Sequence, residues 1–262
     1  MNTEIKDYFS KNRITWEQFY ESERKVIEKI WDDNCDSVLD IGCSCAGLFA
    51  ALKQKFNLKQ YVGVELDAEA ADFAKMQYPE ITIVNSDFEK YETENKNQYQ
   101  LVFSLSCFDW NTNLNVDPLE SFYTMFKKSW QMVKKGGSLI ISLRLDPDIT
   151  IMDIKKSYQF INYNGKKTGD IANYSVISAN DCFNLFRELN PISITGYGYF
   201  GKPGITSVTP FEQVCFAVFA IMKRSEENID CHSDITLPIE IENIYSKYFN
   251  NLKNESNPFF AK

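Results

Sequence analysis

Residues 37–48 read Ser-Val-Leu-Asp-Ile-Gly-Cys-Ser-Cys-Ala-Gly-Leu, and this stretch decides the fold. Residues 37–41 have the apolar character of a buried strand, which a turn of small residues breaks at Gly42. A helix is expected to follow at about 48–56. A strand, a tight turn and a helix in this order bring the amides of the helix N-terminus beside a ligand. The stretch therefore predicts a nucleotide-type pocket in an α/β protein.

An acid near the end of this strand separates two kinds of nucleotide-binding turn. A dinucleotide fold needs the pattern Gly-x-Gly-x-x-Gly, which lets the backbone approach a pyrophosphate. Here the glycines are Gly42 and Gly47, and Asp40 stands two residues before the first of them. A carboxylate at that position repels a diphosphate but suits a cationic ligand. S-adenosylmethionine is such a ligand, because it carries a sulfonium and an ammonium group and has no phosphate.

The stretch resembles motif I of the class I, Rossmann-like S-adenosylmethionine-dependent methyltransferases, in which an acid precedes Gly-x-Gly-x-Gly. Ser44 and Ala46 stand where this family has its second and third glycines. Both side chains are small enough for a close approach of the backbone, but a position that needs a positive φ is strained at Ser or Ala. A strand-to-helix turn for another ligand, or for none, is the alternative interpretation.

Composition excludes several classes of protein. The chain has 262 residues, of which 44% are hydrophobic and 15% aromatic, enough for the core of one large α/β domain. It has no apolar run of membrane-spanning length and no N-terminal signal pattern, so we expect a cytoplasmic protein without membrane partners. A net charge of −8, without a dense cluster of Lys and Arg, disfavours tight binding to nucleic acid. A small-molecule or glycan substrate fits this charge better.

The seven cysteines do not form a recognisable metal site. Cys43 and Cys45 are closer together than the usual two-residue metal knuckle, and a second Cys/His pair is absent. We expect reduced, buried cysteines and no metal.

Two further acids follow the next predicted strands and strengthen the resemblance. Glu65 lies 25 residues beyond Asp40. An acid about 20 residues after the glycine turn typically accepts hydrogen bonds from ribose hydroxyls. The resemblance implies this role for Glu65, with Leu66 beside it in the cofactor site. It also implies that Asp87 and Phe88 lie near the adenine.

The second half of the resemblance sets the fold. The loop after a fourth strand at 99–104 is expected to face the transferable methyl group, because ligands of open α/β sheets bind beyond the carboxyl ends of the strands. A helix at 118–133, a Lys-Lys-Gly-Gly turn and a strand at 138–144 resemble the family's next units. The implied fold is a Rossmann-like three-layer α/β sandwich, with a seven-stranded mixed sheet and an antiparallel last strand. The implied cofactor-binding residues are Asp40, Gly42, Ser44, Gly47, Glu65, Leu66, Asp87, Phe88 and Ser104.

The chain divides into three parts on this interpretation. Residues 1–34 contain apolar residues spaced for one helical face, which predicts a leading helix that packs on the sheet or partly covers the cofactor as a lid. Residues 35–223 form the methyltransferase domain, with an aromatic and amide-rich insertion at 145–179 where the family places substrate-recognition elements. Residues 224–262 are polar and are expected to form a tail with one short helix at about 239–249.

Few side chains are candidates for catalysis. Methyl transfer needs a nucleophile aligned with the methyl–sulfur bond, and a base helps when the nucleophile is a hydroxyl. The single histidine, His232, is in the predicted tail and is a base only if the tail folds back. Asp109, in the loop after the fourth strand, is the candidate base or orienting group. Arg144 is a candidate to bind an anionic group, or to pair with Asp109 or Asp146.

These features favour a methyltransferase that acts on a small molecule, with O-methylation of a sugar or glycan precursor as the first hypothesis. Ser104-Leu-Ser-Cys stands where amino-directed nucleic-acid methyltransferases carry their Asn/Asp-Pro-Pro-Tyr/Phe motif. One alternative is a catalytically silent S-adenosylmethionine-binding partner or regulatory protein, which the replaced glycines favour. Another is an NAD-dependent oxidoreductase, against which Asp40 argues.

Overall fold

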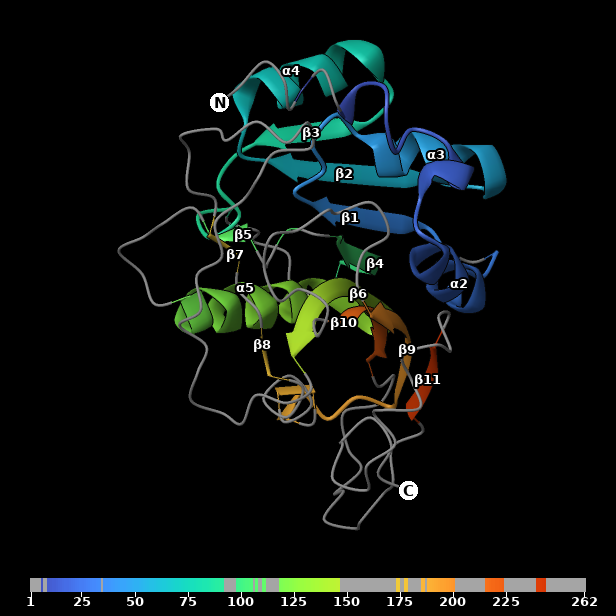
Figure 1. The fold of residues 1–262 in the computed structure, drawn as a ribbon. Helices are drawn as coiled ribbons and strands as arrows, with labels where there is room; N and C mark the ends of the chain where they lie inside the picture. Colours follow the sequence, from blue (N-terminus) through green and yellow to red (C-terminus); the bar gives the residue numbers. More distant parts are fainter. Residues whose placement is uncertain are drawn as a thin grey trace.

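A computed structural model of the chain describes the residues that build one large sheet and the helices on its two faces (Figure 1). Most of the predicted insertion and of the predicted tail, including His232, lies outside the described residues. The described residues are 6, 9–33, 35–91, 98–105, 107, 110–111, 118–146, 173–174, 177–178, 185–186, 188–200, 215–223 and 239–243.

Strand β1 (Ser37–Ile41) lies in the interior of the sheet and is buried along its whole length. It pairs in parallel with β2 (Gln60–Glu65) on one side and with β4 (Tyr99–Ser104) on the other. The carboxyl ends of these strands therefore meet at one edge of the sheet, where ligands of such sheets bind. The remaining strands of the sheet are β3 (Thr82–Asn85), β6 (Val133–Asp146), β8 (Ile177–Ser178), β9 (Ser193–Phe200), β10 (Cys215–Met222) and β11 (Ile239–Asn243).

The order of the strands confirms the predicted fold class. Across the described residues the order is β11-β9-β10-β6-β4-β1-β2-β3, and β8 pairs with the end of β6. β10 runs antiparallel to both of its neighbours, β6 and β9, so the sheet is mixed. The sheet thus contains the seven strands that the resemblance implies, extended by β8 and β11.

The prediction of a helix at about 239–249 is wrong for its first residues. Ile239–Asn243 is strand β11, which pairs in parallel with β9. The sequence of this segment, Ile-Glu-Ile-Glu-Asn, alternates apolar and polar residues with the period of a strand. The rest of the predicted helix lies outside the described residues.

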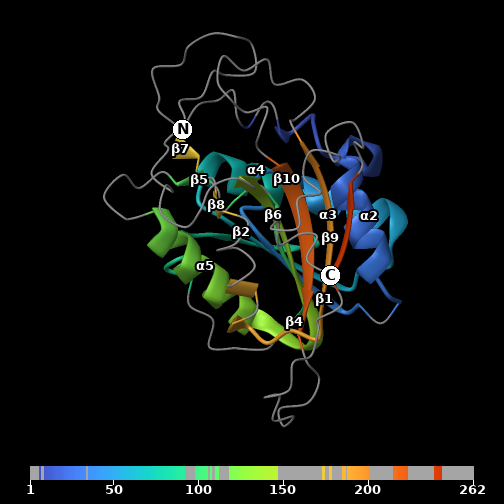
Figure 2. The same ribbon diagram turned by 60° about the horizontal axis from the view of Figure 1, so that its bottom comes forward.

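Helices cover both faces of the sheet. Figure 2 shows α5 (Pro118–Met132) on one side and α2 (Glu21–Ile30) and α3 (Gly47–Lys55) on the other. The short helix η1 (Trp16–Gln18) packs against α3, and α4 (Ala68–Gln77) packs against β2 and β3. In the part of the chain that is described, no helix combines the length and the apolar character needed to cross a membrane.

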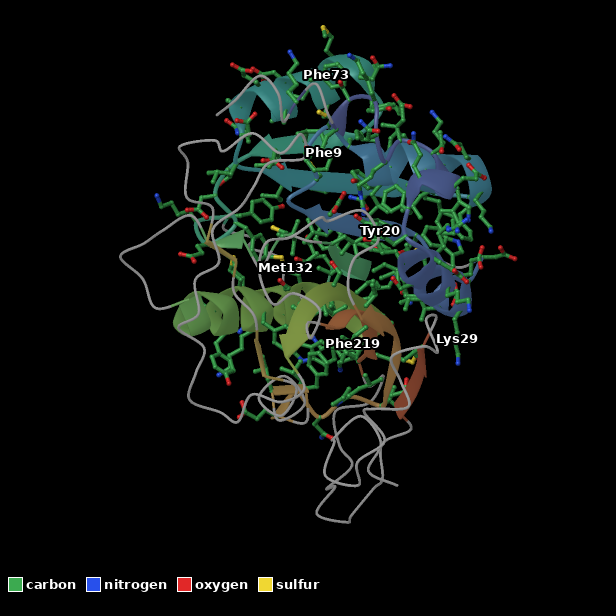
Figure 3. The ribbon with its side chains drawn as sticks, in the orientation of Figure 1. Phe9, Tyr20, Lys29, Phe73, Met132 and Phe219 are labelled. Atoms are coloured by element: carbon green, nitrogen blue, oxygen red, sulfur yellow. The ribbon has the colours of Figure 1, made fainter. Side chains whose placement is uncertain are left out.

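Two apolar cores result, and the alternation of β1 distributes its side chains between them. Leu39 and Ile41 join the core under α5, together with Met132 and Phe219 (Figure 3). Val38 joins the core on the opposite face, under α2 and α3. Because successive side chains of a strand point to opposite faces, Asp40 shares the face of Val38 and points towards α3. The register of the sheet therefore decides which side chains surround the motif acid.

Candidate cofactor site

The turn between β1 and α3 has left-handed backbone at three positions. The φ angles of Gly42, Ser44 and Ala46 are 72°, 48° and 58°. Glycine adopts this region readily, whereas an L-residue loses roughly 1–2 kcal/mol there. Ser44 and Ala46 therefore carry the strain that the sequence indicates for a turn without these glycines.

Backbone and side-chain hydrogen bonds tie this turn to the end of β2. The amides of Gly42 and Cys43 donate to the carbonyl of Val64, at 2.8 and 3.3 Å. The amide of Ser44 donates to Oε2 of Glu65 at 2.7 Å. Glu65 thus lies directly beside the motif turn, as the resemblance implies.

Asp40 and Glu65 form a pair of carboxylates around the turn. Asp40 is only 4% exposed, and the hydroxyl of Tyr61 donates a hydrogen bond to it. Burial, with a smaller contribution from the charge of Glu65, raises the pKa of Asp40 to about 7, while the Tyr61 hydrogen bond and the charge of Arg13 act in the opposite direction. Burial also raises the pKa of Glu65. Both acids are thus placed where a neighbouring cation stabilises their ionised forms.

Two side chains at the carboxyl end of β4 face the same turn. A Cβ atom on Gly42 would lie 2.6 Å from Sγ of Cys107, so Gly42 is required for close approach as well as for its φ angle. Burial, and then the charges of Glu65 and Asp40, raise the pKa of the Cys107 thiol to about 12. The buried hydroxyl of Ser104 acts on this thiol and lowers its pKa. Among the described residues it has no other hydrogen-bond partner. Ser104 therefore places a buried polar atom at the end of β4, next to the thiol that contacts Gly42.

The remaining residues implied for the cofactor site, Leu66 beside Glu65 and Asp87 and Phe88 near the adenine, lie in different surroundings. Leu66, directly after β2, is 55% exposed and offers an apolar side chain at the edge of the sheet. Asp87 accepts a hydrogen bond from the amide of Glu89 at 2.9 Å through Oδ1. Phe88 is 7% exposed and packs into the core with Tyr91, so its side chain serves mainly as packing.

The N-terminal segment contributes a contact that sequence reasoning missed. A Cβ atom on Gly47 would lie 2.2 Å from the carbonyl oxygen of Arg13, so the segment rests directly on the start of α3. Nη2 of Arg13 lies 2.8 and 3.0 Å from the two carboxylate oxygens of the buried Glu23. Trp16 is buried in the core beside Phe56, which is the packing role expected for the leading segment.

Tyr61 was also missed, because its position beside Asp40 is set by the register of two strands and not by a local sequence pattern. In the parallel pairing of β1 and β2, Tyr61 lies opposite Val38 and so shares the face of Asp40. A hydroxyl on that face of β2 is the natural partner for a buried carboxylate on β1. The contacts of Arg13 leave no sequence pattern either, because they depend on how a loop packs.

The candidate catalytic residues are less fully described. Asp109 lies outside the described residues, and Arg144 is placed on β6 opposite Phe216 of β10. The loop after β4 continues into β5 (Trp110–Asn111), which pairs with β7 (Asn173–Tyr174). The returning part of the predicted insertion therefore pairs with the loop after β4, and, through β8, with the end of β6.

Comparisons with known proteins agree with this geometry. Residues 38–137, which include β1, the motif turn and Glu65, match a family model described as a methyltransferase domain. Residues 38–137 thus have the sequence pattern of a methyltransferase domain, and the fold around them is that of the class I, S-adenosylmethionine-dependent methyltransferases. No protein with a curated description matches the sequence.

Solved structures similar to this methyltransferase domain share its fold at low sequence identity. The [4+2]-cyclase SpnF has a TM-score of 0.55 and 10% identity, over 78% of this chain and 80% of the other. Phosphoethanolamine N-methyltransferase 2 of Haemonchus contortus, in complex with S-adenosyl-L-methionine, has a TM-score of 0.54 and 15% identity, over 77% of this chain and 52% of the other. Residues 961–1257 of the O-methyltransferase StiE have a TM-score of 0.52 and 12% identity, over 79% and 74%.

The residues of the methyltransferase domain fit S-adenosylmethionine, the cofactor of this class. The two carboxylates, the buried Asp40 and the partly buried Glu65, suit a ligand with sulfonium and ammonium groups and no phosphate. The buried hydroxyl of Ser104 adds a polar group at the end of β4, and the exposed Leu66 adds an apolar one at the end of β2. The bound cofactor would supply the electrophilic methyl group, and the chain's own residues would bind and orient it.

Proposed function

We propose that this domain transfers the methyl group of S-adenosylmethionine to a hydroxyl group of a small molecule, with a sugar or glycan precursor as the acceptor class. The observation that carries the proposal is the pair of carboxylates around the motif turn, of which Asp40 is buried and Glu65 partly buried. Asp40 and Glu65 both have pKa values raised by burial, so the pair gains from a cationic ligand and repels a diphosphate. This charge arrangement supports the methyl donor over a nicotinamide dinucleotide.

Each cofactor contact in the proposal has one role. Glu65 accepts hydrogen bonds from the ribose hydroxyls, and Leu66 packs against the adenine, with Asp87 accepting from its amino group. Asp40 stabilises the positive charge of the methionine part electrostatically. Gly42, Ser44 and Gly47 let the backbone approach the ligand, and Ser104 offers its hydroxyl. Phe88 supports the adenine side mainly from within the core.

The acceptor side rests on sequence and on strand pairing. The β5–β7 and β8–β6 pairs bring the end of the insertion to the loop after β4 and to the end of β6. Trp110 and Asn111 stand opposite Tyr174 and Asn173 in the first of these pairs, and aromatic and amide residues suit the recognition of polyhydroxylated rings. We assign Asp109 as the base or orienting group and Arg144 as the residue that binds an anionic group of the acceptor.

A second candidate function is binding of S-adenosylmethionine without methyl transfer. The left-handed Ser44 and Ala46 favour it, because a strained turn weakens cofactor binding. The likeness to SpnF, described as a [4+2]-cyclase, is a reminder that one fold carries several activities. An NAD-dependent oxidoreductase is the third possibility, and the charge of Asp40 and Glu65 disfavours it.

Calorimetric titration separates these functions. The purified chain is titrated with S-adenosylmethionine, S-adenosylhomocysteine and NAD, beside Asp40→Asn and Glu65→Gln, with Glu69→Gln as a control for loss of an exposed charge on α4. Bound protein is then supplied with a panel of sugars and nucleotide sugars, and release of S-adenosylhomocysteine is followed. Binding with turnover on a hydroxyl acceptor supports the proposal. Binding without turnover on any acceptor supports the silent alternative, and binding of NAD alone contradicts both.

A further inference from the structure

The turn after β1 is built from residues that resist its shape. Ser44 and Ala46 have positive φ angles, which a side chain on Cα disfavours. Without outside contacts, a turn of this sequence would spend part of its time in other conformations. Something in the fold must therefore hold it.

Glu65 makes the contact that holds the first of these two residues. Its Oε2 accepts the amide of Ser44 at 2.7 Å, and its Oε1 accepts the amide of Asp67 at 2.8 Å. The carboxylate is thus fixed from both sides, and hydrogen bonds to a charged acceptor are stronger than those to a neutral one. The parallel pairing of Ile41 with Val64 fixes the backbone of Glu65 beside the turn.

Ala46 is held differently and provides an internal comparison. Its amide donates to the carbonyl of Cys43 at 2.9 Å, within the turn itself. The same backbone strain therefore occurs at two positions of the turn. The amide of Ser44 donates to Glu65, whereas the amide of Ala46 donates within the turn.

From this difference we infer that Glu65 is a positioning residue, which sets the fraction of the protein whose turn is ready to receive the cofactor. This inference rests on the proposed function, which identifies the ligand of the turn as S-adenosylmethionine. Each carboxylate oxygen has a second lone pair, so the same group can still accept ribose hydroxyls. A glycine at position 44 would adopt the left-handed backbone without the hydrogen bond to Glu65. That hydrogen bond explains how this chain keeps the turn with a serine at position 44.

The test is a set of double-mutant comparisons. Glu65→Gln keeps the shape of the side chain but leaves one carbonyl oxygen for two amides. It is made alone, with Ser44→Gly and with Ala46→Gly. Affinity for S-adenosylhomocysteine is measured by calorimetry, and hydrogen exchange of residues 42–47 is followed without ligand.

The apparent affinity of a ligand falls in proportion to the competent fraction of the protein. We expect Glu65→Gln to weaken the binding of S-adenosylhomocysteine. The factor by which it weakens binding should be about three to ten times smaller in the Ser44→Gly background than in the otherwise unchanged chain. Ala46→Gly should reduce that factor less than Ser44→Gly does, because the amide of Ala46 donates within the turn and not to Glu65. Exchange in the turn should become faster in Glu65→Gln and be restored less by Ala46→Gly than by Ser44→Gly.

Equal losses of affinity in all three backgrounds, with unchanged exchange, would show that Glu65 acts only by touching the ligand. That result overturns the positioning role and leaves the proposed function intact. If the unmodified chain does not bind the ligand, the proposed function fails, and the exchange measurement alone still decides the positioning role.

Discussion

Tyr61 and Asp40 are joined by a hydrogen bond in the interior, where the phenol of β2 donates to the carboxylate of β1. The pair lies on the face of the sheet that α3 covers, and the rings of Phe49 and Tyr61 are 5.3 Å apart. Asp40 is thereby buried but partnered, and its charge is available to the motif turn. The chemistry of this pair leads to the next three predictions.

Cofactor affinity should depend on pH through Asp40. The carboxyl has a pKa of about 7 in the folded chain, raised from 3.8 by burial. A cationic ligand favours the ionised form, so affinity for S-adenosylmethionine should rise as the pH increases from 6 to 8. Asp40→Asn should bind more weakly at pH 8 and lose most of this dependence. Calorimetry at three pH values measures this affinity. If the affinity of Asp40→Asn changed with pH as that of the wild type does, Asp40 would not be the group that causes the dependence.

The same pKa makes a prediction about the stability of the free protein. Because the folded pKa lies above the unfolded one, the folded chain holds a proton on Asp40 between pH 4 and 7 that the unfolded chain has lost. The contribution of Asp40 to stability is therefore present in full below pH 4 and is lost as the pH rises through 7. Urea unfolding of the wild type and of Asp40→Asn across this range should converge at low pH and diverge at high pH. Parallel curves would show that Asp40 titrates normally.

Tyr61→Phe should destabilise the fold by about 1–3 kcal/mol, because it leaves a buried carboxylate without its donor. It should also move the midpoint of the pH-dependent binding to higher pH, since the hydrogen bond from Tyr61 lowers the pKa of Asp40. The combination Tyr61→Phe with Asp40→Asn should restore part of the stability. An additive loss in that double variant would mean that the two side chains act independently.

Ala46→Gly should stabilise the chain by about 1 kcal/mol, because relief of the left-handed backbone exceeds the added entropy of the unfolded glycine. Ala46 has a φ of 58° and is buried. Ala50→Gly, inside α3, is the matched control and should destabilise by about 1 kcal/mol. Chemical unfolding of both variants gives the comparison, and a loss of stability in each would show that the turn at 46 is not strained.

Gly47→Ala should displace the N-terminal segment, although alanine is the better helix former by about 1 kcal/mol. Its Cβ would lie 2.2 Å from the carbonyl of Arg13, a backbone atom with little freedom to move. We expect faster cleavage by trypsin at Lys11 and Arg13 and a changed environment of Trp16, read by fluorescence. Unchanged cleavage with raised stability would mean that the segment does not depend on this contact.

Local sequence patterns specified the central elements of the sheet and their order. The run 37–48 specified the central strand, the turn and the helix, because an apolar run, small turn residues and a helical period are all local signals. The spacing from Asp40 to Glu65 likewise indicated the second acid of the site. The structure leaves Arg144 without a described side chain and Asp109 outside the described residues, so their roles stay predictions.

The tertiary structure alone decided how distant residues meet. The pairing of Tyr61 with Asp40 depends on strand register, and the contacts of Arg13 on Gly47 and of Cys107 on Gly42 depend on loop packing. None of these leaves a local pattern, because each joins segments far apart in the chain. The alternation at 239–243 was present in the sequence, but the polar composition of the tail obscured it until the pairing with β9 revealed a strand. The periodicity of the sequence fixes which face of a helix or strand is apolar. Close packing in the folded chain fixes which distant side chains contact that face.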